Sequence, residues 1–152
     1  VPAGVESGMR LRLAGEGEGG RRGRGDLYVH LTVSPHPVFQ RDGANLLVEY
    51  PLSISQAALG TQLDVPTMNG RVSMKVPSGT QSGTVFRVRG KGLRDVHGGG
   101  SGDLLVRVTV ETPTNLTSTQ RRLLEEMGKS LGIEAHPSQR SLLSKVKDLL
   151  KK

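Results

Sequence analysis

The chain of 152 residues contains no cysteine and no tryptophan, and aromatic residues make up only 3% of it. Without cysteine it can form neither disulfides nor thiolate metal sites, which fits a reducing, cytoplasmic compartment. No apolar run approaches the roughly 20 residues needed to span a membrane, and no signal-peptide pattern opens the sequence. The sequence therefore predicts a cytoplasmic protein without a membrane partner, with a core built mainly from valine and leucine.

Acidic residues are outnumbered, since 21 Lys and Arg stand against 14 Asp and Glu, for a formal net charge of +7. The basic residues are dispersed, apart from Arg21, Arg22 and Arg24 and the pair at 151–152. The few aromatic residues are scattered, so they form no stacking platform for single-stranded nucleic acid. We expect a solvated basic surface. A basic nucleic-acid-binding β-protein is the alternative.

Glycine, in contrast, is abundant, and much of it lies in an internal repeat. Residues 1–33 align with residues 76–110, and the second copy is two residues longer in its glycine-rich loop. An alternating apolar segment enters each loop and another leaves it, which predicts a strand, a connection and a strand. The apolar residues on one face are Met9, Leu11, Leu13, Leu27, Val29, Leu31 and Val33 in the first copy, and Phe86, Val88, Leu104, Val106, Val108 and Val110 in the second.

The first loop also satisfies the pattern G-x-G-x-x-G, at Gly15, Gly17 and Gly20. In nucleotide-binding proteins this pattern follows a strand and opens a helix whose amides hold a pyrophosphate. Here both loops lead into predicted strands, the second copy lacks the third glycine, and Glu16 and Glu18 would repel phosphate. We therefore interpret the loop as a turn in which glycines supply positive φ.

Further strands are predicted between the two copies. "NLLVEYPLSI" places Leu46, Val48 and Tyr50 on one face before Pro51 should interrupt the ladder. "SQAALG" predicts a short helical turn ending at Gly60. "TQLDV" and "GRVSMKV" predict two strands joined near an Asn-Gly turn.

These patterns predict a mainly β protein with two tandem β-sandwich domains, the first truncated at its N-terminus, followed by C-terminal α-helices. The expected domains cover residues 1–35, 36–115 and 116–152. Because the sequence begins with Val1 inside the first domain, we expect it to be a piece of a longer chain.

The sequence pattern of the C-terminal region predicts two helices. Thr117 and Gln120 form a capping box, and Leu123, Leu124, Met127 and Leu131 follow at helical spacing. A short linker at His136-Pro137 leads to an amphipathic segment of about three turns, too short to be stable alone. Its stripe should dock in a homodimer or, as the alternative, fold back on Leu123 and Met127. The stripe consists of Leu142, Leu143, Val146, Leu149 and Leu150.

No catalytic constellation is found in the sequence. The histidines His30, His36, His97 and His136 lack metal-ligand spacing. Asp26 and Asp103 occupy equivalent places in the two copies, at the start of a predicted strand, where an Asp commonly binds loop amides. We predict a structural role for both, and no active site, metal or cofactor. A carbohydrate hydrolase would require a close carboxylate pair in a cleft.

Several motifs in order resemble the C-terminal half of DnaJ-type co-chaperones: His36-Pro37-x-Phe39-x-Arg41-Asp42-Gly43, Ala57-Ala58-Leu59-Gly60 and Arg89-Gly90-Lys91-Gly92, set among the two repeat copies. The resemblance runs from Val1 to about Leu131. It implies two β-sandwich client-binding domains and a dimerisation segment. Such a homodimer would hold extended apolar segments of unfolded polypeptides for a DnaK-type ATPase.

The same resemblance shows which family modules this chain lacks. His36-Pro37 is followed by Val38 instead of the Asp of a J-domain motif, and a chain without cysteine has no cysteine-rich zinc module. The chain itself should therefore not stimulate the ATPase, and we expect a J-domain upstream of Val1. The resemblance also implies a client groove on the first sandwich, which maps to Val29 with Leu11 and Leu13 as neighbours. The alternative is that all three are ordinary core.

Overall fold

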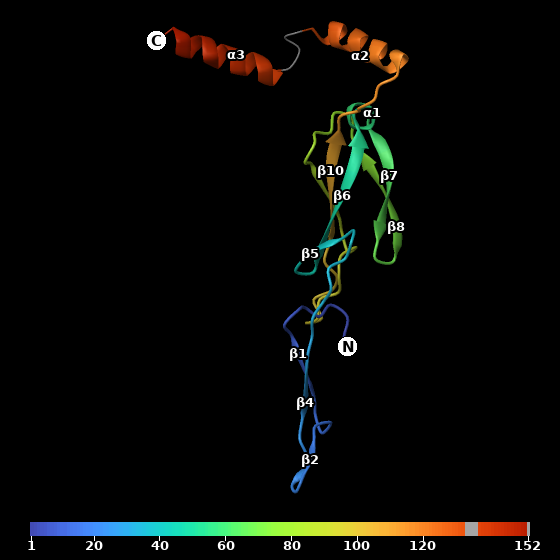
Figure 1. The fold of residues 1–152 in the computed structure, drawn as a ribbon, viewed down its shortest axis with the longest axis vertical. Helices are drawn as coiled ribbons and strands as arrows, with labels where there is room; N and C mark the ends of the chain where they lie inside the picture. The colour runs from blue at the N-terminus through green and yellow to red at the C-terminus, as the bar shows by residue number, and fades with distance from the viewer. Residues whose placement is uncertain (133–136, 152) are drawn as a thin grey trace. The chain divides into compact units, whose positions relative to one another are not determined.

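The computed structural model describes residues 1–132 and 137–151. Its contacts divide the chain into two units, Val1–Thr112 and Pro113–Lys152 (Figure 1). Strands and one short helix make up the first unit, and two longer helices make up the second. The predicted mainly β class with C-terminal helices is confirmed.

The first repeat copy folds as an antiparallel pair of strands, β1 (Arg10–Leu13) and β4 (Leu27–His30), which we call the first hairpin. The glycine-rich connection between them forms a small hairpin of its own, from β2 (Gly19–Gly20) and β3 (Gly23–Arg24). The sequence did not predict this small hairpin. Its turn is permitted by the positive φ of 114° at Gly23.

The rest of the first unit is a β-sandwich, which we call the second sandwich. Its four-stranded sheet has the order β5 (Gln40–Asp42), β6 (Asn45–Ser53), β10 (Leu104–Glu111) and β9 (Val85–Val88), with β6 and β10 parallel at the centre. The antiparallel pair β7 (Thr61–Thr67) and β8 (Gly70–Val76) forms the opposing layer. The core between the layers consists of Phe39, Leu46, Val48, Leu52, Ala57, Leu63, Val65, Val76, Leu104, Val106 and Val108.

The expectation that Pro51 interrupts its strand was wrong. β6 continues through Pro51, which lies opposite Thr109 of β10. The pairing of β5 with β6 ends at Leu47, so one edge of β6 is open at Pro51 in the described part of the chain. A missing N–H at an open edge removes no ladder hydrogen bond.

The turns and caps between the copies follow the sequence closely. Helix α1 (Ile54–Leu59) ends at Gly60, as predicted, and it begins with a capping box between Ser53 and Gln56 that was not predicted. The predicted hairpin between β7 and β8 is also confirmed, with Thr67 opposite Gly70. In contrast, β5 was not predicted, since a three-residue polar strand has no periodicity to reveal it.

The second unit contains α2 (Ser118–Leu131) and α3 (Pro137–Leu150). The predicted capping box of Thr117 and Gln120 is confirmed. In the expected linker, His136 lies outside the described residues, and Pro137 is already helical. Proline is favoured in the first turn of a helix, so α3 is longer than the three turns expected. No helix in the described ranges is long and apolar enough to cross a membrane.

Candidate functional site

The first hairpin presents an apolar face that contains all three residues of the predicted client groove. Leu11 lies directly opposite Val29, and Leu13 lies opposite Leu27. Because paired residues of an antiparallel ladder share a face, these side chains form one strip. Leu11 and Val29 are half-buried, whereas Leu13 and Leu27 are each 43% exposed. We call this strip the open face; it consists of Met9, Leu11, Leu13, Leu27, Val29 and Leu31.

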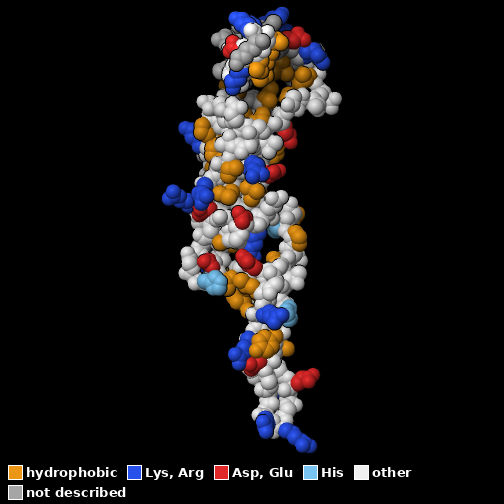
Figure 2. Space-filling model, turned by 90° about the vertical axis from the view of Figure 1, so that its left-hand side faces the viewer, with side chains coloured by type: hydrophobic (Ala, Val, Ile, Leu, Met, Phe, Trp, Pro, Cys, Tyr) orange, Lys and Arg blue, Asp and Glu red, His pale blue; other side chains and the backbone are white. Residues whose placement is uncertain are grey.

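The second repeat copy shows what covers such a face when a partner layer is present. Leu104, Val106 and Val108 are the repeat equivalents of Leu27, Val29 and Leu31, and all three are fully buried. They pack in one cluster with residues of β7 and β8. The described residues provide no such layer over the open face, and Figure 2 shows hydrophobic side chains at the molecular surface. The same pattern therefore makes a core in one copy and an apolar surface in the other.

An arginine and an aspartate close the glycine-rich loop in each copy. In the first copy, Arg12 Nη2 lies 2.6 Å from Asp26 Oδ2, and the Gly15 amide donates to Asp26 Oδ1 at 3.1 Å. In the second copy, Arg87 Nη1 lies 2.7 Å from Asp103 Oδ2, and the Gly90 amide donates to the other carboxylate oxygen at 3.0 Å. The structural role predicted for both aspartates is confirmed.

The environment of Asp103 also affects its ionisation. The hydrogen bond from the Gly90 amide, and next the hydrogen bond from Arg87, hold the pKa of Asp103 below its usual value of 3.8. Sequence reasoning missed both arginine partners. The signal was present, because Arg12 and Arg87 occupy equivalent positions in the aligned copies.

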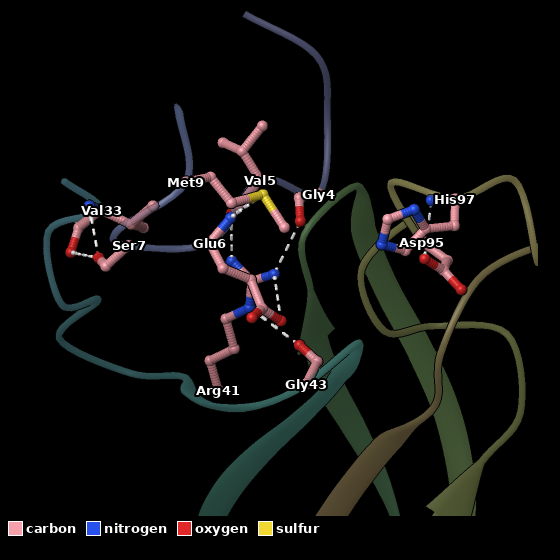
Figure 3. A network of polar contacts seen from close by, with 10 residues as sticks. All are labelled: Gly4, Val5, Glu6, Ser7, Met9, Val33, Arg41, Gly43, Asp95 and His97. Carbon is pink, nitrogen blue, oxygen red and sulfur yellow. Dashed lines mark hydrogen bonds and ion pairs between the residues drawn. The ribbon is translucent and has the colours of Figure 1, made fainter. Parts of the chain in front are cut away.

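Arg41 connects the segment that precedes β1 to the second sandwich (Figure 3). From β5, its Nη1 donates to the carbonyl of Val5 at 2.6 Å and its Nη2 to the carbonyl of Gly4 at 2.8 Å. Its Nε donates to the carbonyl of Gly43 at 2.9 Å. The Glu6 carboxylate lies farther away, at 3.5 Å from Nη2. A single side chain thus binds backbone segments that are far apart in the sequence.

The other members of the same motif shape the chain just before Arg41. The Nδ1 atom of His36 accepts hydrogen bonds from the amides of Val38 and Phe39, at 3.1 and 3.3 Å. The His36 ring lies 5.1 Å from the Phe39 ring, and Phe39 belongs to the buried core. His36 therefore forms the turn, Phe39 anchors it, and Arg41 binds back to the first repeat copy.

A cavity of about 950 Å³ lies beside this connection. Its lining combines the Gly4–Ser7 segment, the residues around His36 and the side chains of Leu46, Met68 and Leu93. The Gly4–Ser7 segment and the second sandwich are therefore not in contact along their whole length.

Within the described residues, no cluster of His, Asp or Glu could hold a metal ion.

The predicted dimerisation stripe is exposed on α3. Its five residues, Leu142, Leu143, Val146, Leu149 and Leu150, are between 43% and 82% exposed. On α2, Leu123 and Met127 are also exposed. Dimerisation through α3 stays a prediction, and so does the alternative in which its stripe folds back on Leu123 and Met127.

A comparison with protein families gives one match over most of the chain. The family model described as the DnaJ C terminal domain matches residues 1–113. The matched range contains both repeat copies, the second sandwich and the Arg41 connection, and it ends where the helical unit begins.

Proposed function

The chain belongs to the DnaJ C-terminal domain family, and from that premise we propose that it holds unfolded client polypeptides through the open face of the first hairpin. The clients are extended segments with apolar side chains. The chain works as a binding module without catalysis. As part of a longer DnaJ-type co-chaperone, it holds such clients for a DnaK-type ATPase.

The observation that carries this proposal is the contrast between the two repeat copies. Val106, the equivalent of Val29, is fully buried by the opposing layer of its sandwich. Val29 and Leu11 have the same strand geometry without such a layer in the described residues. An extended client can lay apolar side chains on this strip while its backbone pairs with a strand edge. Each apolar side chain buried in this way contributes about 1.5–3 kcal/mol.

Substitution of Val29 by Asp tests the proposal. A carboxylate in the centre of the open face would have to be desolvated by a bound apolar segment, so suppression of the aggregation of a denatured client should fall strongly. The matched control is His30→Asp, which introduces the same carboxylate on the next residue, whose side chain points to the other face. This control should suppress aggregation like the wild type.

Circular dichroism and the amide NMR signals of β1 and β4 should show that the first hairpin is folded in both variants. Equal suppression by folded wild-type and Val29→Asp protein would contradict the proposal. A salt titration tests the nucleic-acid alternative, because phosphate-driven binding falls steeply with salt whereas apolar binding does not. We expect client binding to persist at high salt.

A further inference from the structure

The Gly4–Ser7 turn, which precedes β1, is where the first hairpin meets the second sandwich. Arg41 binds the carbonyls of Gly4 and Val5 in the turn before β1, and it also binds the carbonyl of Gly43 between β5 and β6 of the second sandwich. The Arg41 side chain is 26% exposed, so these charge-assisted hydrogen bonds are partly shielded from water. A planar guanidinium can serve three acceptors at once, which a lysine ammonium at the end of a flexible stem cannot reproduce in this geometry.

The equivalent turn in the second repeat copy is held differently. There the amides of Gly79 and Thr80 donate to carbonyls of α1, at 2.9 Å and 3.1 Å for the bonds to Ala57. That turn is thus bound within its own sandwich. In the first copy, the turn is bound by an arginine of the second sandwich, so the same local structure connects the first repeat copy to that sandwich.

Another contact at this connection involves the Gly4 backbone. A Cβ atom on Gly4 would collide with the carbonyl oxygen of Arg94, so the Gly4 backbone touches the second glycine-rich loop there. The buried core of the described residues, however, lies entirely between Phe39 and Val108 and includes nothing from the first hairpin. The cavity of about 950 Å³ occupies space that a packed interface would fill. Polar contacts, not a shared core, join the two parts.

We propose that Arg41 is a positioning residue that fixes the orientation of the first hairpin, and with it the open face, relative to the second sandwich. The importance of this orientation for clients rests on the proposed function. The role of Arg41 in fixing the orientation is independent of the proposed function. When the three hydrogen bonds are lost, the hairpin pivots about the Gly4 contact while both parts stay folded.

The absence of cysteine makes the orientation measurable with introduced cysteines. Spin labels at Tyr28→Cys, on the exposed face of β4, and at Lys75→Cys, on an exposed position of β8, report the distance between the two parts. In the protein that carries both labels and retains Arg41, we expect a narrow distribution of the distance between the labels. Arg41→Gln and Arg41→Lys should both broaden the distribution, because neither provides the three-way fork. Arg71→Gln, at an exposed arginine of β8, is the matched control and should leave it narrow.

Distributions of equal width and mean for the wild type and Arg41→Gln, with both proteins folded, would overturn the proposal. A narrow distribution in Arg41→Lys would overturn it as well. The ion pair with Glu6 would then be enough to fix the orientation of the hairpin, without the three hydrogen bonds of the guanidinium. Binding of a short labelled peptide rich in Leu and Val separates the two proposals. Its affinity should be unchanged in Arg41→Gln, because one segment needs only the open face. If the wild type does not bind this peptide, the proposed function fails while the distance measurement still tests Arg41.

Discussion

Single aspartates organise the glycine-rich loops, and Asp103 does so with an altered ionisation. The hydrogen bonds from Gly90 and Arg87 favour its carboxylate form, so its pKa in the folded protein lies below 3.8. The unfolded chain then binds the proton more readily than the folded chain. The resulting stabilisation is fully present above pH 3.8 and is lost as the pH falls through the lower folded-state pKa.

This linkage predicts the behaviour of Asp103→Asn. The variant should be less stable than the wild type at neutral pH, and the difference should shrink as the pH falls below about 4. Urea denaturation across this pH range measures it. Arg87→Gln and the double variant complete a cycle, in which the combined loss should be smaller than the sum of the single losses. A difference between wild type and variant that does not change with pH would show that the carboxylate charge has no part in stability.

Residues differ in how far the sequence predicts their partners. The contact between Leu11 and Val29 follows from alternation in two strands joined by one loop, and this pairing was predictable as a shared face. The two distant partners of Arg41 were not predictable, because they are backbone carbonyls 36 and 37 residues away. Carbonyls are present at every residue, so no side-chain pattern marks them. The resemblance pointed to Arg41 as part of a motif but did not show what it binds.

Among the strands and helices, prediction succeeded where periodicity or capping was strong. The capping box of α2, the end of α1 at Gly60 and the hairpin of β7 and β8 are local features and were predicted correctly, whereas the capping box of α1 was not predicted. The parallel pairing of β6 with β10 joins strands about sixty residues apart, and local patterns do not specify such a neighbour. The continuation of β6 through Pro51 depends on where β5 stops pairing, which is again a property of the sheet and not of the strand.

Helix α3 leads to a prediction about association. The exposed stripe has five apolar residues, each contributing about 1.5–3 kcal/mol when buried, which must exceed the cost of association. We expect a homodimer in which both copies of the helix take part. Val146→Glu, in the middle of the stripe, should convert the dimer to a monomer in sedimentation at micromolar concentration.

Ser144→Glu is the matched control for this experiment. It adds the same charge two residues away, on the other side of α3, and should leave the dimer intact. A chain that ends at Pro137 should also sediment as a monomer. If the wild type is itself monomeric at micromolar concentration, the stripe has another role and the expected dimer is absent.

For the whole molecule, the sequence sets an expectation about the ATPase partner. His36 and Pro37 are followed by Val38, so this stretch lacks the Asp of a J-domain motif, and in the structure it forms a turn beside the second sandwich. Added to a DnaK-type ATPase in single-turnover hydrolysis, the chain should leave the rate at its baseline. An intact DnaJ-type co-chaperone serves as the positive control. Acceleration that rises with the dose of this chain would contradict the expectation.

The open face also has a thermal consequence. In the second sandwich the equivalent strip is dehydrated by β7 and β8 when the protein folds, whereas under the proposed function a bound client would dehydrate it on the first hairpin. Binding should then resemble a partial folding reaction and carry a negative heat-capacity change, which isothermal titration calorimetry at several temperatures would measure. Because apolar association weakens on cooling, the chain should hold its clients less tightly in the cold than at room temperature.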